Sequence, residues 1–174
     1  MLHCKLERNG FSVCLALFRD VKNAKDIKQH VMNGELEMTL LNTKMVTDPF
    51  QVLVAANRAV CNQRQARMTT KNVHSEVLFC LSPLKNISDS FRKFGMSDSA
   101  DSVFVVIVND TEDKTLHRLI EIIDGQQVAV SDVKHFCDET LVKKMFKVTD
   151  EELSVCSLTD ALVSKIASKE FVTV

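Results

Sequence analysis

The residues of this chain best suited to binding chemistry are four cations in the stretch "NRAVCNQRQARMTTK", residues 57–71. Arg58, Arg64, Arg67 and Lys71 stand there without a single carboxylate. Because they are four of the 22 Lys and Arg of the chain, 18 remain elsewhere against 23 Asp and Glu. Positive charge is therefore concentrated in this stretch, and guanidinium and ammonium groups are the usual donors to phosphate oxygens.

The spacing of these cations fits two roles. On a helix, Arg64 and Arg67 are three residues apart and Lys71 is four further along, so all three would share one face. Such a face can present several donors to a phosphate backbone. Cations at the end of a helix also complement its dipole while facing solvent, and the residue types alone leave both roles open.

Motifs that carry catalysis are missing from the sequence. The four glycines, Gly10, Gly34, Gly95 and Gly125, stand isolated, which excludes a glycine-rich phosphate loop. The five histidines are dispersed, and neither a GxSxG elbow nor an HExxH pair is present. We interpret His74 as a surface or edge-strand histidine. The sequence therefore favours binding over catalysis, and we expect no enzymatic activity.

The cysteines predict neither disulfides nor a metal site. Cys14, Cys61 and Cys80 lie in apolar segments, where a small reduced thiol packs well. No CxxC occurs, and "HFC" at 135–137 is a lone His/Cys pair without a second pair at ligand spacing. We expect no bound metal and no cofactor.

Nothing in the sequence predicts a membrane protein. The longest apolar runs, such as "VFVVIV" at 103–108, are far shorter than the roughly 20 residues of a spanning helix. The first residues, "MLHCKLERNG", carry charges where a signal peptide needs its apolar middle region. We expect an intracellular protein.

Hydrophobic periodicity and capping residues predict the elements of the fold. They are strands at 11–18, 75–83 and 102–108, a short helical segment at 36–41, helices beginning after Asn23, Asp48 and Asn86, a helix around 116–123, and a capping box at 149–152. The helix after Asp48 is expected to reach about Met68, and Gly95 is expected to end the helix after Asn86 as a left-handed stop.

The same pattern predicts the fold class. Strands that are apolar on both faces need helices on both sides of their sheet. A chain of 174 residues is also of the size of one ordinary domain. We therefore predict an α/β fold of the α+β type: a single domain, 1–174, with a central mixed β-sheet flanked by helices.

Three stretches together resemble a known family. They are "LFRDVKNA" (17–24), "DPFQVLVAANRAV" (48–60) and "SEVLFCLSPLKNISDSFRKFG" (75–95). In order and spacing they resemble the kinase-binding subunits of the KEOPS (EKC) complex, over essentially the whole chain. The resemblance implies a central mixed sheet flanked by helices and a location in cytoplasm and nucleus.

The resemblance also implies a function. Members of the family are non-catalytic subunits of the assembly that makes threonylcarbamoyladenosine next to the anticodon of tRNAs. They bind a small atypical protein kinase, are linked to the other KEOPS subunits through it, and are implicated in binding the tRNA. With this resemblance, Arg58, Arg64, Arg67 and Lys71 become candidate contacts to the tRNA backbone.

The segment "NISDSFRKFG" is the candidate kinase contact. Ile87, Phe91 and Phe94 recur at helical spacing and could supply apolar anchors, with Arg92 and Lys93 at the rim. The alternative is that this stripe packs on the sheet, in which case Phe91 and Phe94 belong to the core. Ile87, at the start of the helix, is the first choice for a contact residue.

Two other functions stay open at this point. One is a freestanding RNA-binding domain, which the complete lack of Trp and Tyr disfavours because aromatic side chains stack on bases. The other is an enzyme or small-molecule binder with an unrecognised pocket between sheet and helices. Turnover or ligand binding by the isolated protein would favour the latter, and a stoichiometric complex with the kinase would favour the subunit.

Overall fold

A computed structural model describes residues 1–6 and 10–169, with only the backbone of Thr111. Its sheet has five strands: β1 (Leu2–Leu6), β2 (Phe11–Arg19), β3 (Thr39–Leu41), β4 (Ser102–Val108) and β5 (Gln126–Val128). Its helices are α1 (Ala24–Met32), α2 (Pro49–Arg64), α3 (Val73–Leu81), α4 (Ile87–Phe94), α5 (Lys114–Ile122), α6 (Glu139–Phe146), α7 (Asp150–Val155) and α8 (Leu158–Ser168). Three short 3-10 segments, η1 (Thr43–Met45), η2 (Thr111–Asp113) and η3 (Val130–His135), complete the described elements.

The sheet has the order β1-β2-β4-β3, and β5 pairs with the other end of β2. Each pairing among the described residues is antiparallel. The predicted α/β class with a sheet flanked by helices is confirmed, but the prediction of a mixed sheet is wrong. The reason is that β4 lies between β2 and β3 and runs against both, so these two never pair with each other.

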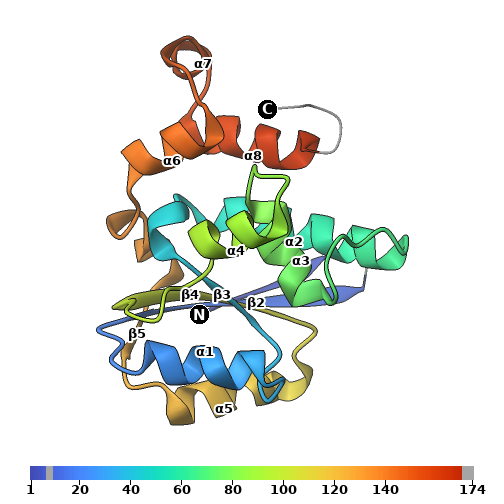
Figure 1. Ribbon diagram of the computed structural model, residues 1–174, viewed down its shortest axis with the longest axis vertical. Helices are drawn as coiled ribbons and strands as arrows, with labels where there is room; N and C mark the ends of the chain where they lie inside the picture. The colour runs from blue at the N-terminus through green and yellow to red at the C-terminus, as the bar shows by residue number, and fades with distance from the viewer. Residues whose placement is uncertain (7–9, 170–174) are drawn as a thin grey trace.

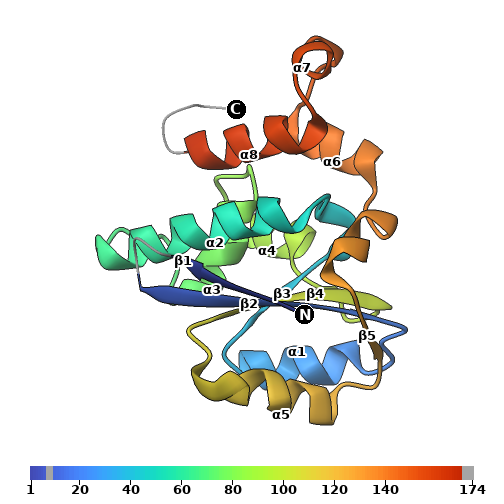
Figure 2. The ribbon, with the colours of Figure 1, turned by 180° about the vertical axis from the view of Figure 1, so that it is seen from behind.

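Helices cover both faces of the sheet (Figures 1 and 2). On one face lie α1 and α5, and their apolar residues form one core cluster with β2 and β4. On the other face lie α2, α3 and α4, with α6 and α8 stacked outside them and α7 projecting beyond. This thicker side holds the larger core cluster, which extends to Phe146 of α6 and Leu162 of α8.

Local capping explains why several elements begin where the sequence predicts. The Asp48 carboxylate accepts a 2.8 Å hydrogen bond from the Phe50 N–H, and Pro49 occupies the first helical position, which starts α2. Thr149 and Glu152 form the predicted capping box of α7. The strands predicted at 11–18 and 102–108 are confirmed as β2 and β4, and β4 is buried on both faces.

Two predicted elements are of the wrong type. The segment at 36–41 is not helical, because its second half, β3, completes the ladder of β4. The segment at 75–83 is not a strand but belongs to α3, which buries seven of its nine residues, from His74 to Leu81 except Ser75. An element surrounded by protein is mostly apolar on every side, and a short apolar run has the same composition in a buried helix and in a buried strand.

Gly95 ends α4 in a manner that the sequence did not predict. Its backbone is extended, with φ −79° and ψ 155°, so the prediction of a left-handed stop is wrong. Here a glycine is needed for space, since a Cβ at this position would lie 2.5 Å from the carbonyl oxygen of Phe91.

Candidate partner-binding surfaces

The first surface is the outward side of α4. Ile87 and Phe91 are 40% and 38% exposed and lie one helical turn apart, and Arg92 and Lys93 beside them are exposed as well. Phe94 is fully buried and meets Phe146 edge-on, with 5.8 Å between ring centroids. Phe94 is therefore a core residue, which is one of the two roles that the sequence left open, and the stripe is divided between the core and solvent.

Local signals fix where α4 begins and how its charges are arranged. The side-chain oxygen of Asn86 accepts a 3.0 Å hydrogen bond from the Asp89 N–H and caps the helix. Asp89 in turn accepts a 2.5 Å hydrogen bond from the Arg92 guanidinium, three residues on. The exposed face of α4 thus presents two large apolar side chains one turn apart, followed by two cations in the last turn.

Two adjoining hollows extend this surface across the molecule. The first, of about 610 Å³, lies between α1, β3, α3 and α4 and includes Phe91 and Arg92 in its lining. The second, of about 730 Å³, shares Met32, His74 and Phe91 with the first and reaches Lys71. The candidate kinase contact and part of the candidate tRNA contact are consequently neighbours on one side of the protein.

The second surface is the basic stretch, which is not the continuous helical face that the sequence predicts. α2 ends at Arg64 rather than near Met68, and Ala66 has a left-handed φ of 53° that turns the chain. Arg67 and Lys71 therefore lie in the loop 65–72, which we call the basic loop. The side chains of Arg64, Arg67 and Lys71 are all exposed.

A buried carboxylate holds the basic loop. Glu76 of α3 is fully buried and accepts hydrogen bonds from the Thr69 N–H (3.1 Å), the Thr70 N–H (2.9 Å) and the Thr70 hydroxyl (2.8 Å). Its other oxygen accepts from the Asn62 side-chain amide of α2 at 3.0 Å. A charge that is buried and fully hydrogen-bonded is costly to disturb, so Glu76 determines the path of the loop between Arg67 and Lys71.

Sequence reasoning missed this role of Glu76 because it predicted a strand there. The signal that could have found it is Asn72, which caps α3 by accepting a 2.8 Å hydrogen bond from the Ser75 N–H. An asparagine three residues before a serine, followed by an acidic residue in the first turn, is typical of a helix start.

The structure places Arg58 apart from the other three cations. Its guanidinium donates hydrogen bonds to the carbonyl oxygens of Ile166 (2.6 Å) and Ala167 (2.7 Å), at the C-terminal end of α8. The last carbonyls of a helix carry partial negative charge, which a guanidinium compensates. Arg58 thus joins α2 to α8.

His74 is buried, so its interpretation as a surface or edge-strand residue is wrong. Its Nε2 accepts a 3.1 Å hydrogen bond from the Val108 N–H, and its carbonyl accepts from the Thr39 hydroxyl at 2.7 Å. Burial lowers the pKa of His74 to about 4, with the nearby Asp110 opposing the shift. The neutral ring fastens α3 to the sheet.

The cysteines differ in how deeply they are buried. Cys14 and Cys80 are buried as predicted, Cys61 is half-buried, and none of the six cysteines, all of which the structure describes, is part of a disulfide. Burial, together with the carboxylates of Asp113 and Asp110, raises the pKa of the Cys14 thiol to about 11. Among the described residues, His3, Cys14 and Asp113 form the one group of His, Cys, Asp or Glu side chains close enough together to hold a metal ion, on the α5 side of the sheet.

No helix among the described residues has the length and apolarity of a membrane span.

Comparisons with known proteins agree with the resemblance seen in the sequence. The model of the family described as "Kinase binding protein CGI-121" matches residues 18–170. The EKC/KEOPS complex subunit TPRKB of Danio rerio is 40% identical over 161 residues, which cover 92% of each chain. The EKC/KEOPS complex subunit cgi121 of Aspergillus fumigatus is 37% identical over 80% of this chain and 78% of its own. The subunit of Schizosaccharomyces pombe is 29% identical over 79% and 82%. This chain therefore belongs to the CGI-121 family of kinase binding proteins.

Proposed function

We propose that this protein is a non-catalytic subunit of the KEOPS/EKC complex that binds the small atypical kinase of the complex directly. The observation that carries the proposal is the family match over residues 18–170, with relatives that are named as subunits of this complex. The chain, 1–174, acts as one such domain in the cytoplasm and nucleus, and it supports formation of threonylcarbamoyladenosine on tRNA without catalysing it.

The kinase-binding surface in this proposal is α4. Ile87 and Phe91 are partly exposed apolar side chains, and Phe91 also lines a hollow, which suits side chains that anchor an interface. Arg92 and Lys93 lie at the rim, where charges set the rate of association more than the affinity. Phe94 contributes from beneath by fixing α4 against Phe146.

The test is a calorimetric titration of the protein into the purified kinase. We expect one-to-one binding and a loss of at least about 30-fold in affinity for Ile87→Glu, since burying a carboxylate in an apolar contact is costly. The matched control is Ile120→Glu on α5, because Ile120 is similarly exposed (43%) but lies on the opposite face of the sheet. Absence of wild-type binding would refute the function, and equal affinities of the two variants would refute the surface.

The tRNA contact in this proposal consists of Arg64, Arg67 and Lys71. Arg64 ends α2, and Arg67 and Lys71 lie in the basic loop, whose path is held by Glu76; the loop adjoins the α4 surface through the hollow that reaches Lys71. The proposed contact does not include Arg58, because its guanidinium donates hydrogen bonds to carbonyls of α8. A fixed array of donors suits backbone phosphates, which position a nucleic acid without reading its sequence.

The salt dependence of tRNA affinity tests this contact. With about three phosphates contacted, the slope of log K against log salt is expected to be about −2 to −3, and the double variant Arg64→Ala, Arg67→Ala should reduce it by about two units. The control is Lys22→Ala, Lys25→Ala, which removes two exposed cations at α1 on the other side of the sheet. Unchanged affinity in the first variant, or an equal loss in the second, would contradict the assignment.

A further inference from the structure

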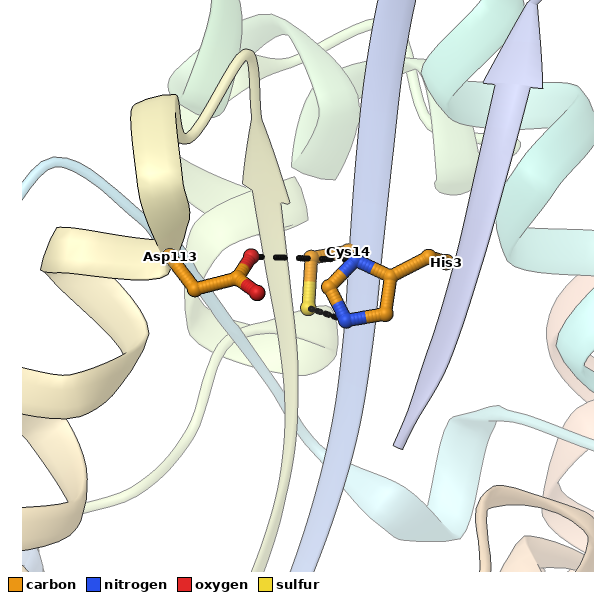
Figure 3. Close-up of side chains that lie close together, drawn as sticks. All are labelled: His3, Cys14 and Asp113. Carbon is orange, nitrogen blue, oxygen red and sulfur yellow. Dashed lines mark hydrogen bonds and ion pairs between the residues drawn. The ribbon is translucent and has the colours of Figure 1, made fainter.

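On the face of the sheet that α5 covers, a histidine, a cysteine and an aspartate from three different segments lie close together (Figure 3). His3 of β1 and Cys14 of β2 are directly opposed in the antiparallel ladder, so their side chains lie on the same face. Asp113 arrives from η2, just before α5. Nitrogen, sulfur and oxygen donors from these residues all lie within 4.8 Å of one another.

Two distances describe the cluster, and they run to the two different nitrogens of the His3 imidazole. The Cys14 Sγ lies 3.9 Å from the His3 Nε2, and the Asp113 Oδ1 lies 3.7 Å from the His3 Nδ1. Ligand atoms around tetrahedral zinc are separated by roughly 3.5 Å, given zinc–sulfur and zinc–nitrogen bonds of about 2.3 Å and 2.0 Å. His3 and Asp113 are partly exposed, so a turn of the imidazole can direct one nitrogen to the point that the other two residues face.

Asp113 has no other described task that would explain its placement. It stands at the N-cap of α5, yet its side chain makes no capping hydrogen bond. Asp110 makes such hydrogen bonds instead: its two carboxylate oxygens accept hydrogen bonds from the N–H groups of Thr115 and Leu116. Asp113 and its neighbour Glu112 both have left-handed backbones, with φ of 54° and 58°, and Asp113 is turned toward His3.

We propose that His3, Cys14 and Asp113 bind a zinc ion with an open fourth position. One thiolate, one imidazole and one carboxylate form a donor set that suits zinc, and three protein ligands leave a place for water. When the zinc–sulfur bond forms, the Cys14 thiol releases its proton to the buffer, so the site gains one negative ligand charge. The ion joins β1, β2 and η2 on the face opposite the proposed kinase and tRNA surfaces.

The experiment is titration of the untagged, reduced full chain with Zn²⁺ alone, followed by calorimetry and melting temperature. We expect one-to-one binding and a melting temperature that rises with zinc concentration, because the ion binds the folded chain. Titration with Co²⁺ should give the absorption bands of a tetrahedral site with thiolate ligation. His3→Gln, at a partly exposed position that tolerates substitution, should weaken binding by at least about tenfold.

Cysteine variants separate this site from adventitious binding. Cys14→Ser should abolish the thiolate absorption band, while Cys4→Ser should bind as the wild type, since Cys4 is opposed to Val13 and faces the other side of the sheet. Failure of the wild type to bind zinc, or equal binding by wild type, His3→Gln and Cys14→Ser, would overturn the proposal. In the first case the three residues are a metal-free hydrogen-bonded cluster, and in the second the zinc binds elsewhere.

Discussion

The two surfaces proposed to bind partners are held in place by different forces. α4 carries its own signals, with an Asn86 cap at one end and the fully buried Phe94 at the other. The basic loop has no regular structure between α2 and α3, and its path depends on hydrogen bonds to the Glu76 carboxylate of the next helix. Apolar packing therefore positions the first surface, and one buried charge positions the second.

The largest loss of stability is expected from truncating Phe94, the side chain that packs α4 on the core. Phe94→Ala leaves a cavity beside Phe146 and should lower the free energy of unfolding by about 3–5 kcal/mol, as measured by urea denaturation. Phe91→Ala is the control, because Phe91 is partly exposed and should cost much less. Equal losses for the two variants would show that α4 is not held by Phe94.

The second-largest effect is a loss of folding stability at low pH, caused by the buried His74 of α3. The folded pKa of His74, about 4, lies below its ordinary value of 6.5, so as pH falls the unfolded chain binds the proton first. The stabilisation is complete above about pH 6.5 and is lost as pH falls through 4, a loss of about 3 kcal/mol. Protonation also ends the acceptance of the Val108 N–H by Nε2.

Urea denaturation between pH 7 and pH 4 measures this loss. His74→Gln, which has no group that titrates in this range, should be less stable at pH 7 and should depend less on pH between about 6.5 and 4. A variant with the same pH dependence as the wild type would assign the loss to other groups.

The smallest effect on stability is expected at the basic loop. Glu76→Gln turns an amide donor toward groups that already donate, so we expect a loss of about 1–3 kcal/mol. Faster hydrogen exchange at the Thr69 and Thr70 amides should accompany it, together with weaker tRNA binding and unchanged kinase binding. Glu37→Gln, at an exposed position, is the control. Wild-type exchange rates in Glu76→Gln would contradict the role of this carboxylate.

The candidate sites could be predicted in part. Capping and periodicity identified α4 and its five candidate residues, but periodicity cannot tell which side of a stripe meets the core. The contact with Phe146, some 50 positions away in the chain, made Phe94 a core residue. Likewise, the four cations were evident in the sequence. Only the packing of α8 against α2 showed that the Arg58 guanidinium donates hydrogen bonds to carbonyls of α8. The cluster of His3, Cys14 and Asp113 was missed because its members are far apart in sequence.

By itself, the sequence determined the elements whose signals are local: the start of α2 at Asp48 and Pro49, the capping box of α7, and the doubly buried strands β2 and β4. It also determined the family, through the motifs at 17–24, 48–60 and 75–95. Tertiary structure decided that 39–41 is a strand and that the Glu76 carboxylate holds the basic loop. For α3, the sequence carried a start signal at Asn72, but the apolar run after it is typical of a strand as well. The physical reason is that a short apolar segment satisfies its backbone equally well in a helix or a ladder, and only its neighbours determine which is available.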